Sequence, residues 1–198
     1  MTGDLIGRVM ERVREPGAAT TVSRFVSSVP RTPPRQSAPL PPPATLQAVA
    51  EAEALLGFSL PPLLSQLYTT VANGGFGPGY GIVGLRGGYL EHDDIALHDG
   101  TGLDLVGLYY GFRKYGDVPP LVHDFGRDPV LAVEPEGPGW YDKLLVLVNH
   151  GCWQLSCLDC TKAPAPVLSY VGYDLQLRLC YPNIEEWIEA WLEGRKEF

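Results

Sequence analysis

The stretch of residues 58–88, FSLPPLLSQLYTTVANGGFGPGYGIVGLRGG, constrains the fold of this chain more than any other part of it. Its first half predicts a helix that the Pro-Pro pair at 61–62 opens, because proline is tolerated in the first turn of a helix. The Asn-Gly pair at 73–74 then ends the helix, since both residue types accept positive φ. Alternating glycines turn the chain, and the apolar residues 80–85 predict a strand. The stretch therefore predicts a joint between a helix and a sheet.

The glycines of this joint match the spacing of a dinucleotide-binding loop, Gly79-x-Gly81-x-x-Gly84. That loop needs a strand before it and a helix after it, so that the helix N-terminus meets the pyrophosphate. Here a helix precedes the glycines and a strand follows them. The order of the elements therefore argues against nucleotide binding and gives the glycines a structural role.

The chain divides into an N-terminal extension, residues 1–43, and a globular domain, residues 44–198. In the extension, apolar residues spaced four apart over residues 4–15 predict a short amphipathic helix capped by Asp4. Residues 31–43, RTPPRQSAPLPPP, are too rich in proline for a helix or a central strand. They predict a semi-rigid linker of polyproline character, and a spacer is favoured over a ligand for an aromatic-lined groove.

The globular domain carries helical patterns and, in its C-terminal half, a run of strands. Gly57 is placed to end one helix, and Asp104 and Asn183 are placed to cap two others. A meander of strands with helices packed at its side is an α+β domain and not a doubly wound sheet. The predicted helices cover residues 45–56, 105–115 and 184–193, and the predicted strands cover residues 144–148, 153–159, 167–171 and 175–180, with a further short strand at 130–133.

The formal net charge of the chain is −8, and it is unevenly distributed. Residues 1–43 carry a net charge of +3, whereas residues 44–198 carry nine Lys and Arg against twenty Asp and Glu, a net of −11. An acidic body repels nucleic-acid phosphates, so no nucleic-acid partner is expected. The same charge would attract a basic protein, although solubility alone also explains it.

The distribution of apolar residues predicts the cellular compartment of the protein. No apolar run approaches the roughly 18 residues that predict a membrane-spanning helix. Charged residues between Asp4 and Arg12 interrupt any apolar segment of a secretory signal. We therefore expect a cytoplasmic protein with reduced cysteines, no membrane partner and no cofactor.

One histidine and three cysteines, His150, Cys152, Cys157 and Cys160, have the composition of a zinc site. If residues 153–160 form a strand, however, Cys157 and Cys160 point to opposite faces of the sheet. Cys152 and Cys160 would share a face but lie about 26 Å apart at ~3.3 Å per residue. Small buried thiols are therefore favoured, and a metal site is the alternative that a turn near Leu158 would allow.

A polar loop collects carboxylates and imidazoles that could hold a divalent metal or act as an acid–base pair. A solvated loop is favoured, because no established catalytic motif accompanies these residues. We therefore expect no enzyme activity, with a metal-dependent enzyme as the least favoured alternative. The loop residues are His92, Asp93, Asp94, His98 and Asp99.

Aromatic residues point to a protein-binding surface. Phe76 and Tyr80 flank the glycine loop, and Trp140 and Tyr141 precede the β-rich half. Aromatic residues in loops rich in glycine and proline cannot all be buried, and Tyr and Trp beside acids are typical of protein interfaces. The predicted contact surface consists of Phe76, Tyr80, His92, Asp93, Asp94, Asp99, Trp140, Tyr141 and Asp142.

The order of several short motifs resembles the SUKH superfamily, which includes the yeast cell-wall-assembly regulator. The family pattern is an acidic helix, a Leu-Pro, an apolar helix ending in Asn-Gly-Gly, and a glycine turn leading to a Gly-Leu. Here these elements are residues 51–56, Leu60-Pro61, 63–75 and 82–85. The later LLVLVNHGCWQLSCLDC is similar to the central hairpin of bacterial members, and IEEWIEAWLEG is similar to the closing helix. The resemblance covers residues 44–195.

This resemblance implies an α+β fold and a protein-binding role. Bacterial members are mostly thought to be immunity proteins that neutralise cognate toxins, often nucleases, and an acidic body suits a basic toxin domain. The yeast relative implies a second hypothesis, a regulatory scaffold or adaptor that uses the proline-rich segment for recruitment. The family offers no active site to carry over. The sequence does not indicate an oligomeric state.

Overall fold

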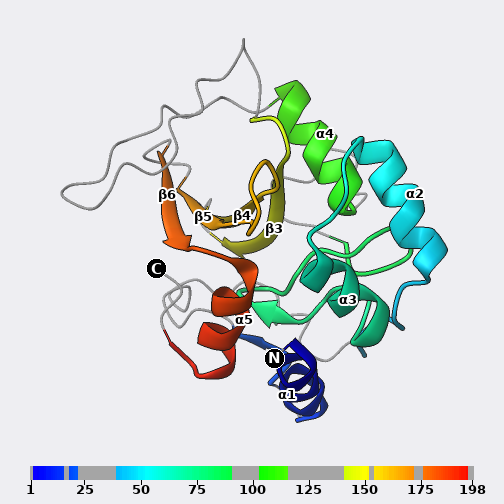
Figure 1. The fold of residues 1–198 in the computed structure, drawn as a ribbon, viewed down its shortest axis with the longest axis vertical. Helices are drawn as coiled ribbons and strands as arrows, with labels where there is room; N and C mark the ends of the chain where they lie inside the picture. The colour runs from blue at the N-terminus through cyan, green and yellow to red at the C-terminus, as the bar shows by residue number, and fades with distance from the viewer. Residues whose placement is uncertain are drawn as a thin grey trace, which may run out of the picture.

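A computed structural model describes residues 2–15, 18–21, 39–90, 103–115, 141–151, 154–171 and 176–195. Within these ranges, five helices accompany a four-stranded antiparallel sheet and a short two-stranded parallel sheet (Figure 1). The arrangement is the predicted α+β class. The elements are α1 (Thr2–Arg14), β1 (Thr20–Thr21), α2 (Leu46–Leu56), α3 (Pro62–Thr70), β2 (Gly77–Pro78), α4 (Leu105–Tyr115), β3 (Leu144–Gly151), β4 (Gln154–Asp159), β5 (Val167–Val171), β6 (Gln176–Tyr181) and α5 (Ile184–Leu192).

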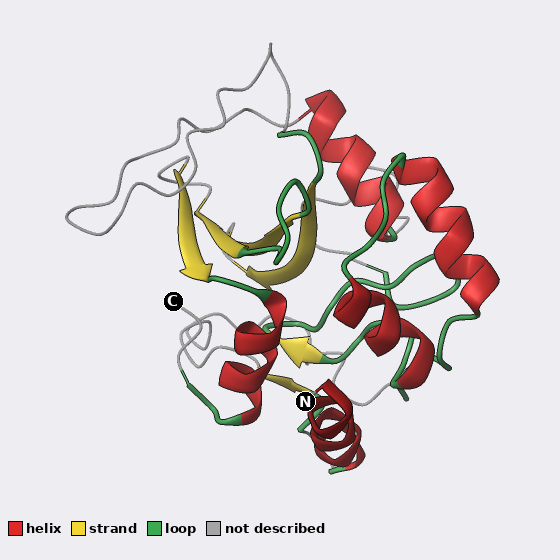
Figure 2. Cartoon of the chain, viewed as in Figure 1, coloured by secondary structure: helices red, strands yellow, loops and turns green. Residues whose placement is uncertain are grey.

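The main sheet is a simple meander, because its strands pair in the order β3-β4-β5-β6. All three pairings are antiparallel, and β3 pairs with β4 from Leu144↔Asp159 to Gly151↔Gln154. Figure 2 shows the sheet curving, with α2 and α4 along one side and α3 and α5 below it. Every residue of β3 is buried, which explains why its first five residues, 144–148, are a continuous apolar run and not an alternating one.

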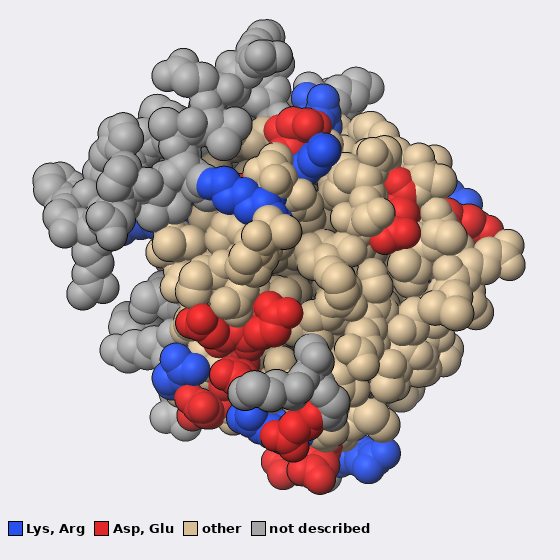
Figure 3. Space-filling view, viewed as in Figure 1, with Lys and Arg blue, Asp and Glu red and all other residues tan. Residues whose placement is uncertain are grey.

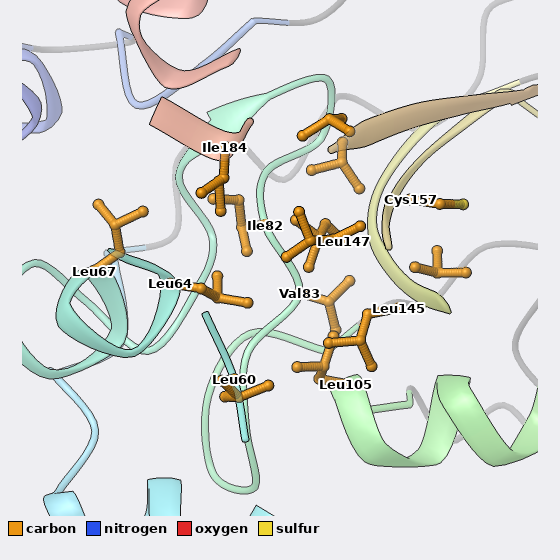
Figure 4. Close-up of a cluster of buried hydrophobic side chains, with 14 of the residues drawn as sticks. Leu60, Leu64, Leu67, Ile82, Val83, Leu105, Leu145, Leu147, Cys157 and Ile184 are labelled. Carbon is orange, nitrogen blue, oxygen red and sulfur yellow. The ribbon is translucent and has the colours of Figure 1, made fainter. Parts of the chain in front are cut away.

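The hydrophobic core lies where α3, α4, α5 and the sheet meet. Leu64 of α3 and Leu105, the first residue of α4, point toward the side chains of β3, and Ile82 and Val83 of the segment after the glycine loop lie between α3 and the sheet (Figure 4). All of these side chains are almost fully buried. The central members are Leu60, Leu64, Leu67, Ile82, Val83, Leu105, Leu145, Leu147, Cys157 and Ile184.

Helix ends follow the capping residues that the sequence indicated. The Thr45 hydroxyl accepts a hydrogen bond from the Ala48 N–H (3.1 Å), and Gly57 ends α2 at φ 80°. Asp104 accepts from the Gly107 N–H (2.7 Å), and Asn183 accepts from the Glu186 N–H (2.8 Å). Each cap satisfies a donor that the first turn of a helix leaves without an intrahelical partner. The predicted helices 45–56, 105–115 and 184–193 are confirmed within one residue of their bounds.

Two boundary predictions are wrong. Helix α3 ends at Thr70, three residues before Asn73, and α1 begins at Thr2, so that Asp4 lies in its first turn and does not cap it.

The apolar residues 80–85 do not form a regular strand. Their backbone groups bond in several directions: the Tyr80 N–H donates to Asn149 O, the Ile82 N–H to Phe76 O and the Val83 N–H to Leu147 O. The predicted strand at 130–133 lies outside the described residues.

The N-terminal extension contacts the domain both through α1 and through its last residues. Leu5, Ile6 and Val9 of α1 belong to the same core as the sheet, and the Pro42 carbonyl accepts from the Asn73 N–H (3.1 Å). The division at residue 43 stays a prediction about folding units. Most of the proline-rich segment lies outside the described residues.

The side chain of Asn73 holds the glycine joint together. It is 5% exposed; its Oδ1 accepts from the Leu85 N–H (2.8 Å), and its Nδ2 donates to Leu85 O (3.3 Å) and Arg86 O (3.4 Å). A Cβ atom at Gly84 or Gly88 would overlap the Asn73 carbonyl oxygen. Only glycine at these two positions lets the chain pass so close to Asn73.

We predict that Asn73→Ala lowers the free energy of unfolding by about 2–3 kcal/mol, because it leaves the buried Leu85 N–H without its acceptor. Urea denaturation followed by circular dichroism measures the change. Asn183→Ala is the matched control and should cost only about 1 kcal/mol, since it removes a cap at the end of a helix. Equal stabilities for Asn73→Ala and the wild-type protein would contradict this role for Asn73.

Candidate functional site

The structure separates the predicted contact residues into two groups at opposite ends of β3. Tyr80 is half-buried, and its N–H donates to Asn149 O (3.1 Å) near the C-terminal end of the strand. Asp142 is exposed and lies just before Leu144, where the strand begins. Tyr80 and Asp142 therefore lie near opposite ends of an eight-residue strand. Their roles in binding stay predictions.

The expected exposure of two aromatic residues is wrong. Phe76 is fully buried, because the loop folds back through the Gly75 N–H to Ile82 O bond (2.8 Å) and the Ile82 N–H to Phe76 O bond (2.7 Å). Tyr141 is also buried, at 6% exposure. Neither side chain is free to contact a partner. The remaining predicted residues, His92, Asp93, Asp94, Asp99 and Trp140, lie outside the described residues.

Asp142 is held by residues that the sequence did not identify as part of a site. Arg113 of α4 donates from Nη1 to Asp142 Oδ1 (2.7 Å) and to the Tyr109 hydroxyl (2.7 Å). The Tyr109 hydroxyl donates to Asp142 Oδ1 (3.2 Å). The hydrogen bonds that Arg113 donates to Asp142 and Tyr109 raise the pKa of Arg113. Both charged side chains are largely exposed, so the pair adds little stability and serves mainly to fix the carboxylate.

Exposed apolar side chains adjoin this cluster on α2 and α4. Tyr110 is 47% exposed, and its hydroxyl donates to the Leu55 carbonyl (2.6 Å), which places α4 directly beside the end of α2. Leu55 is 52% exposed and Leu46 is 80% exposed. We call Leu55, Tyr110, Arg113 and Asp142 the α2–α4 surface. The exposure of a leucine on an amphipathic helix depends on tertiary packing, so the sequence alone did not reveal it.

Charge is distributed unevenly over the visible face of the molecule. Acidic side chains gather over α5, whereas the region over α2, α3 and α4 carries few charged side chains (Figure 3). The first turn of α5 contributes Glu185 and Glu186. An apolar centre with charged groups at its edge is the usual anatomy of a protein-binding surface.

The described members of the predicted zinc set do not converge. The His150 Nε2 atom lies 2.8 Å from the Ser156 hydroxyl, and a Cβ at Gly79 would lie 2.6 Å from His150 Nδ1, so the ring is enclosed beneath the glycine loop. Cys157 pairs with Val146 inside the sheet, and Cys160 lies in the turn after β4. Among the described residues, no group of three or more His, Cys, Asp and Glu could hold a metal ion. Cys152 lies outside them.

Burial makes the three described thiols poor nucleophiles. It raises the pKa of Cys160 to about 12 and that of Cys180 to about 11, and it raises the pKa of Cys157 further. A thiol reacts through its thiolate, so these residues are almost entirely unreactive at neutral pH. The expectation of buried thiols is confirmed for Cys157, which is fully buried, whereas Cys160 is half-buried.

We predict that iodoacetamide at pH 8 alkylates Cys180 about 100-fold more slowly in the folded protein than in guanidinium chloride, because its pKa is raised by about two units. Mass spectrometry of tryptic peptides resolves each cysteine. The folded-state rate should rise with pH up to about 11, where the thiol ionises. Alkylation of Cys180 at pH 8 as fast as in the unfolded chain would contradict this environment.

The chain matches a known family. A model of the SMI1 / KNR4 family (SUKH-1) matches residues 43–190, from the end of the proline-rich segment to α5. A search of curated proteins found no match. None of the described helices is both long and apolar enough to cross a membrane.

Proposed function

Because the chain belongs to the SMI1 / KNR4 family (SUKH-1), we propose that it is a non-enzymatic, cytoplasmic protein that binds and neutralises a cognate toxin. The family match, which covers three quarters of the chain, is the observation that carries this proposal. Members of this family are generally immunity or regulatory proteins without enzyme activity. Neutralisation then works by occlusion: the bound protein covers the toxin's active surface.

Charge supports a basic partner. Residues 44–198 carry a net charge of −11, and a body of this charge attracts a basic toxin domain, with a nuclease as the favoured class. The loop acids Asp93, Asp94 and Asp99 contribute to this charge. Complementary charge acts mainly on the rate of association, and salt screens it.

We assign the contact to the α2–α4 surface, at the Asp142 end of β3. Tyr and Arg are the residue types that most often dominate binding energy, and Tyr110 and Arg113 are both exposed here. Arg113 and Tyr109 orient Asp142 before a partner arrives, which lowers the entropic cost of using it in an interface. Leu55 supplies an apolar contact beside them.

If a toxin gene lies beside the gene of this protein, we predict that its product binds this protein with an association rate that falls as NaCl is raised. Tyr110→Ala should weaken binding by about 2 kcal/mol, as expected for a central aromatic residue, and Asp142→Ala by roughly 0.5–1 kcal/mol. Surface plasmon resonance measures both. Glu11→Ala, an exposed acid on α1, is the control and should leave binding unchanged.

Two outcomes would contradict this proposal. If Tyr110→Ala and Asp142→Ala bind like the wild-type protein while Tyr80→Ala does not, the contact lies at the other end of β3. If the toxin binds but remains fully active in the complex, neutralisation by occlusion is wrong.

The proline-rich segment at residues 31–43 favours a second function, that of a regulatory scaffold or adaptor. Deleting residues 1–43 is a poor test, because the deletion also removes the core residues of α1. Replacing Pro33 and Pro34 by alanine avoids this problem. Loss of partner binding in that variant favours the scaffold, and retention favours the immunity protein.

A further inference from the structure

Residues 2–15 and 18–21 of the N-terminal extension lie outside the family match at 43–190 but are bound to the matched region. Helix α1 packs against α3 and α5, and β1 pairs with β2 (Figure 1). We call these residues the N-terminal segment. Its contacts are of three kinds, and each falls on a different element of the domain.

The first contact is made by the apolar side chains of helix α1. Leu5, Ile6 and Val9 are at most 5% exposed, and Met10 and Val13 are partly buried against the same core. Their spacing places them along one stripe of α1, and the opposite side carries exposed residues such as Glu11. An amphipathic helix with its apolar stripe in a groove is a recurrent mode of peptide recognition.

The second contact fixes α1 on the C-terminal end of α5. Arg12 Nη1 donates to the Leu192 carbonyl (3.0 Å), and the guanidinium lies 4.8 Å from the centre of the Trp191 ring. One turn earlier, Arg8 lies 3.8 Å from Glu189. A cation at this end satisfies a carbonyl without an intrahelical partner and complements the helix dipole. Arg12 therefore sets how far along α5 the helix docks.

The third contact adds a strand to the glycine joint. β1 runs parallel to β2, with Thr20 opposite Gly77 and Thr21 opposite Pro78. The Gly77 N–H donates to the Ala19 carbonyl (2.8 Å). Strand addition provides affinity through the main chain and fixes direction, so a ligand of this site must be a helix followed by a strand.

We propose that α3, α5 and β2 form a binding site for an amphipathic helix followed by a short strand, and that the N-terminal segment occupies this site reversibly in cis. The segment joins the domain through residues 22–38, and β1 pairs with β2 over two residues only, whereas each pairing of the main sheet covers at least five. Elements with short pairings open more readily than a central sheet, and opening here would expose Leu5, Ile6 and Val9. When the segment leaves, the same segment of a second copy is the ligand that fits the site.

The test begins with a specific protease site inserted between Ser27 and Ser28 of the full chain, which is cleaved after folding. A fluorescent peptide of residues 1–21 is then added, and its anisotropy is followed. We expect the labelled peptide to replace the cleaved segment and an excess of unlabelled peptide to displace it. Peptide carrying Arg12→Ala should bind about tenfold more weakly, because it loses a charged hydrogen bond. Peptide carrying Glu11→Ala, whose side chain is exposed, is the control and should bind normally.

Two results would overturn the proposal. One is a cleaved protein that stays folded by circular dichroism but never takes up the labelled peptide. The other is a domain that unfolds, as followed by far-ultraviolet circular dichroism, when the segment dissociates, which would make the segment part of the folding core and not a ligand.

A second measurement keeps the chain intact. In a Val9→Asp variant the segment should undock, and the emission of Trp191, which is 1% exposed, should shift to longer wavelength. This variant should bind the labelled peptide at concentrations at which the wild-type chain does not, since its own segment no longer competes. A folded Val9→Asp protein that fails to bind the peptide would also contradict the proposal.

Discussion

The amide side chain of Asn73 is the interaction on which the rest of this structure depends. It accepts a hydrogen bond from the Leu85 N–H and donates one to the Leu85 carbonyl, and so closes the loop that follows α3. The main chain of Asn73 is used as well, because its N–H donates to Pro42 O and its carbonyl accepts from the Tyr89 N–H (2.9 Å). Asn73 thereby holds three parts of the chain together: the end of the proline-rich segment, the end of α3 and the turn before residue 90.

This joint positions the elements on either side of it. The Tyr68 hydroxyl of α3 donates to Val83 O (2.6 Å), and the Val83 N–H donates to Leu147 O of β3 (2.8 Å). The Leu105 N–H at the start of α4 donates to Gly84 O (2.9 Å). One irregular segment thus links two helices to the sheet, and α4 in turn places Tyr110 and Arg113 beside Asp142. The joint has a structural role, and the proposed binding surface is one of its consequences.

The sequence was most informative where the structural cause is local. The caps at Gly57, Asp104 and Asn183 and the meander of β3 to β6 follow from short-range capping and hydrophobic patterns, so they could be predicted. The exceptions depend on contacts distant in sequence. Residues 80–85 look like a strand but bond to four separate segments. Phe76 is enclosed because its loop folds back. Helix α1 packs on α5 although 180 residues separate Arg12 from Leu192. The α2–α4 surface is also tertiary, since it exists only because α2 and α4 lie side by side.

If Asn73 holds the joint as described, the joint unfolds only with the whole domain. Native-state hydrogen exchange of the Leu85 amide in the wild-type protein measures this. The Leu85 amide should exchange with the same free energy of opening as the amide of Cys157, which lies in β4 and is paired with β3 and β5, and this value should equal the free energy of global unfolding. Exchange of the Leu85 amide through a local opening, while the Cys157 amide stays protected, would show that Asn73 does not hold the domain together.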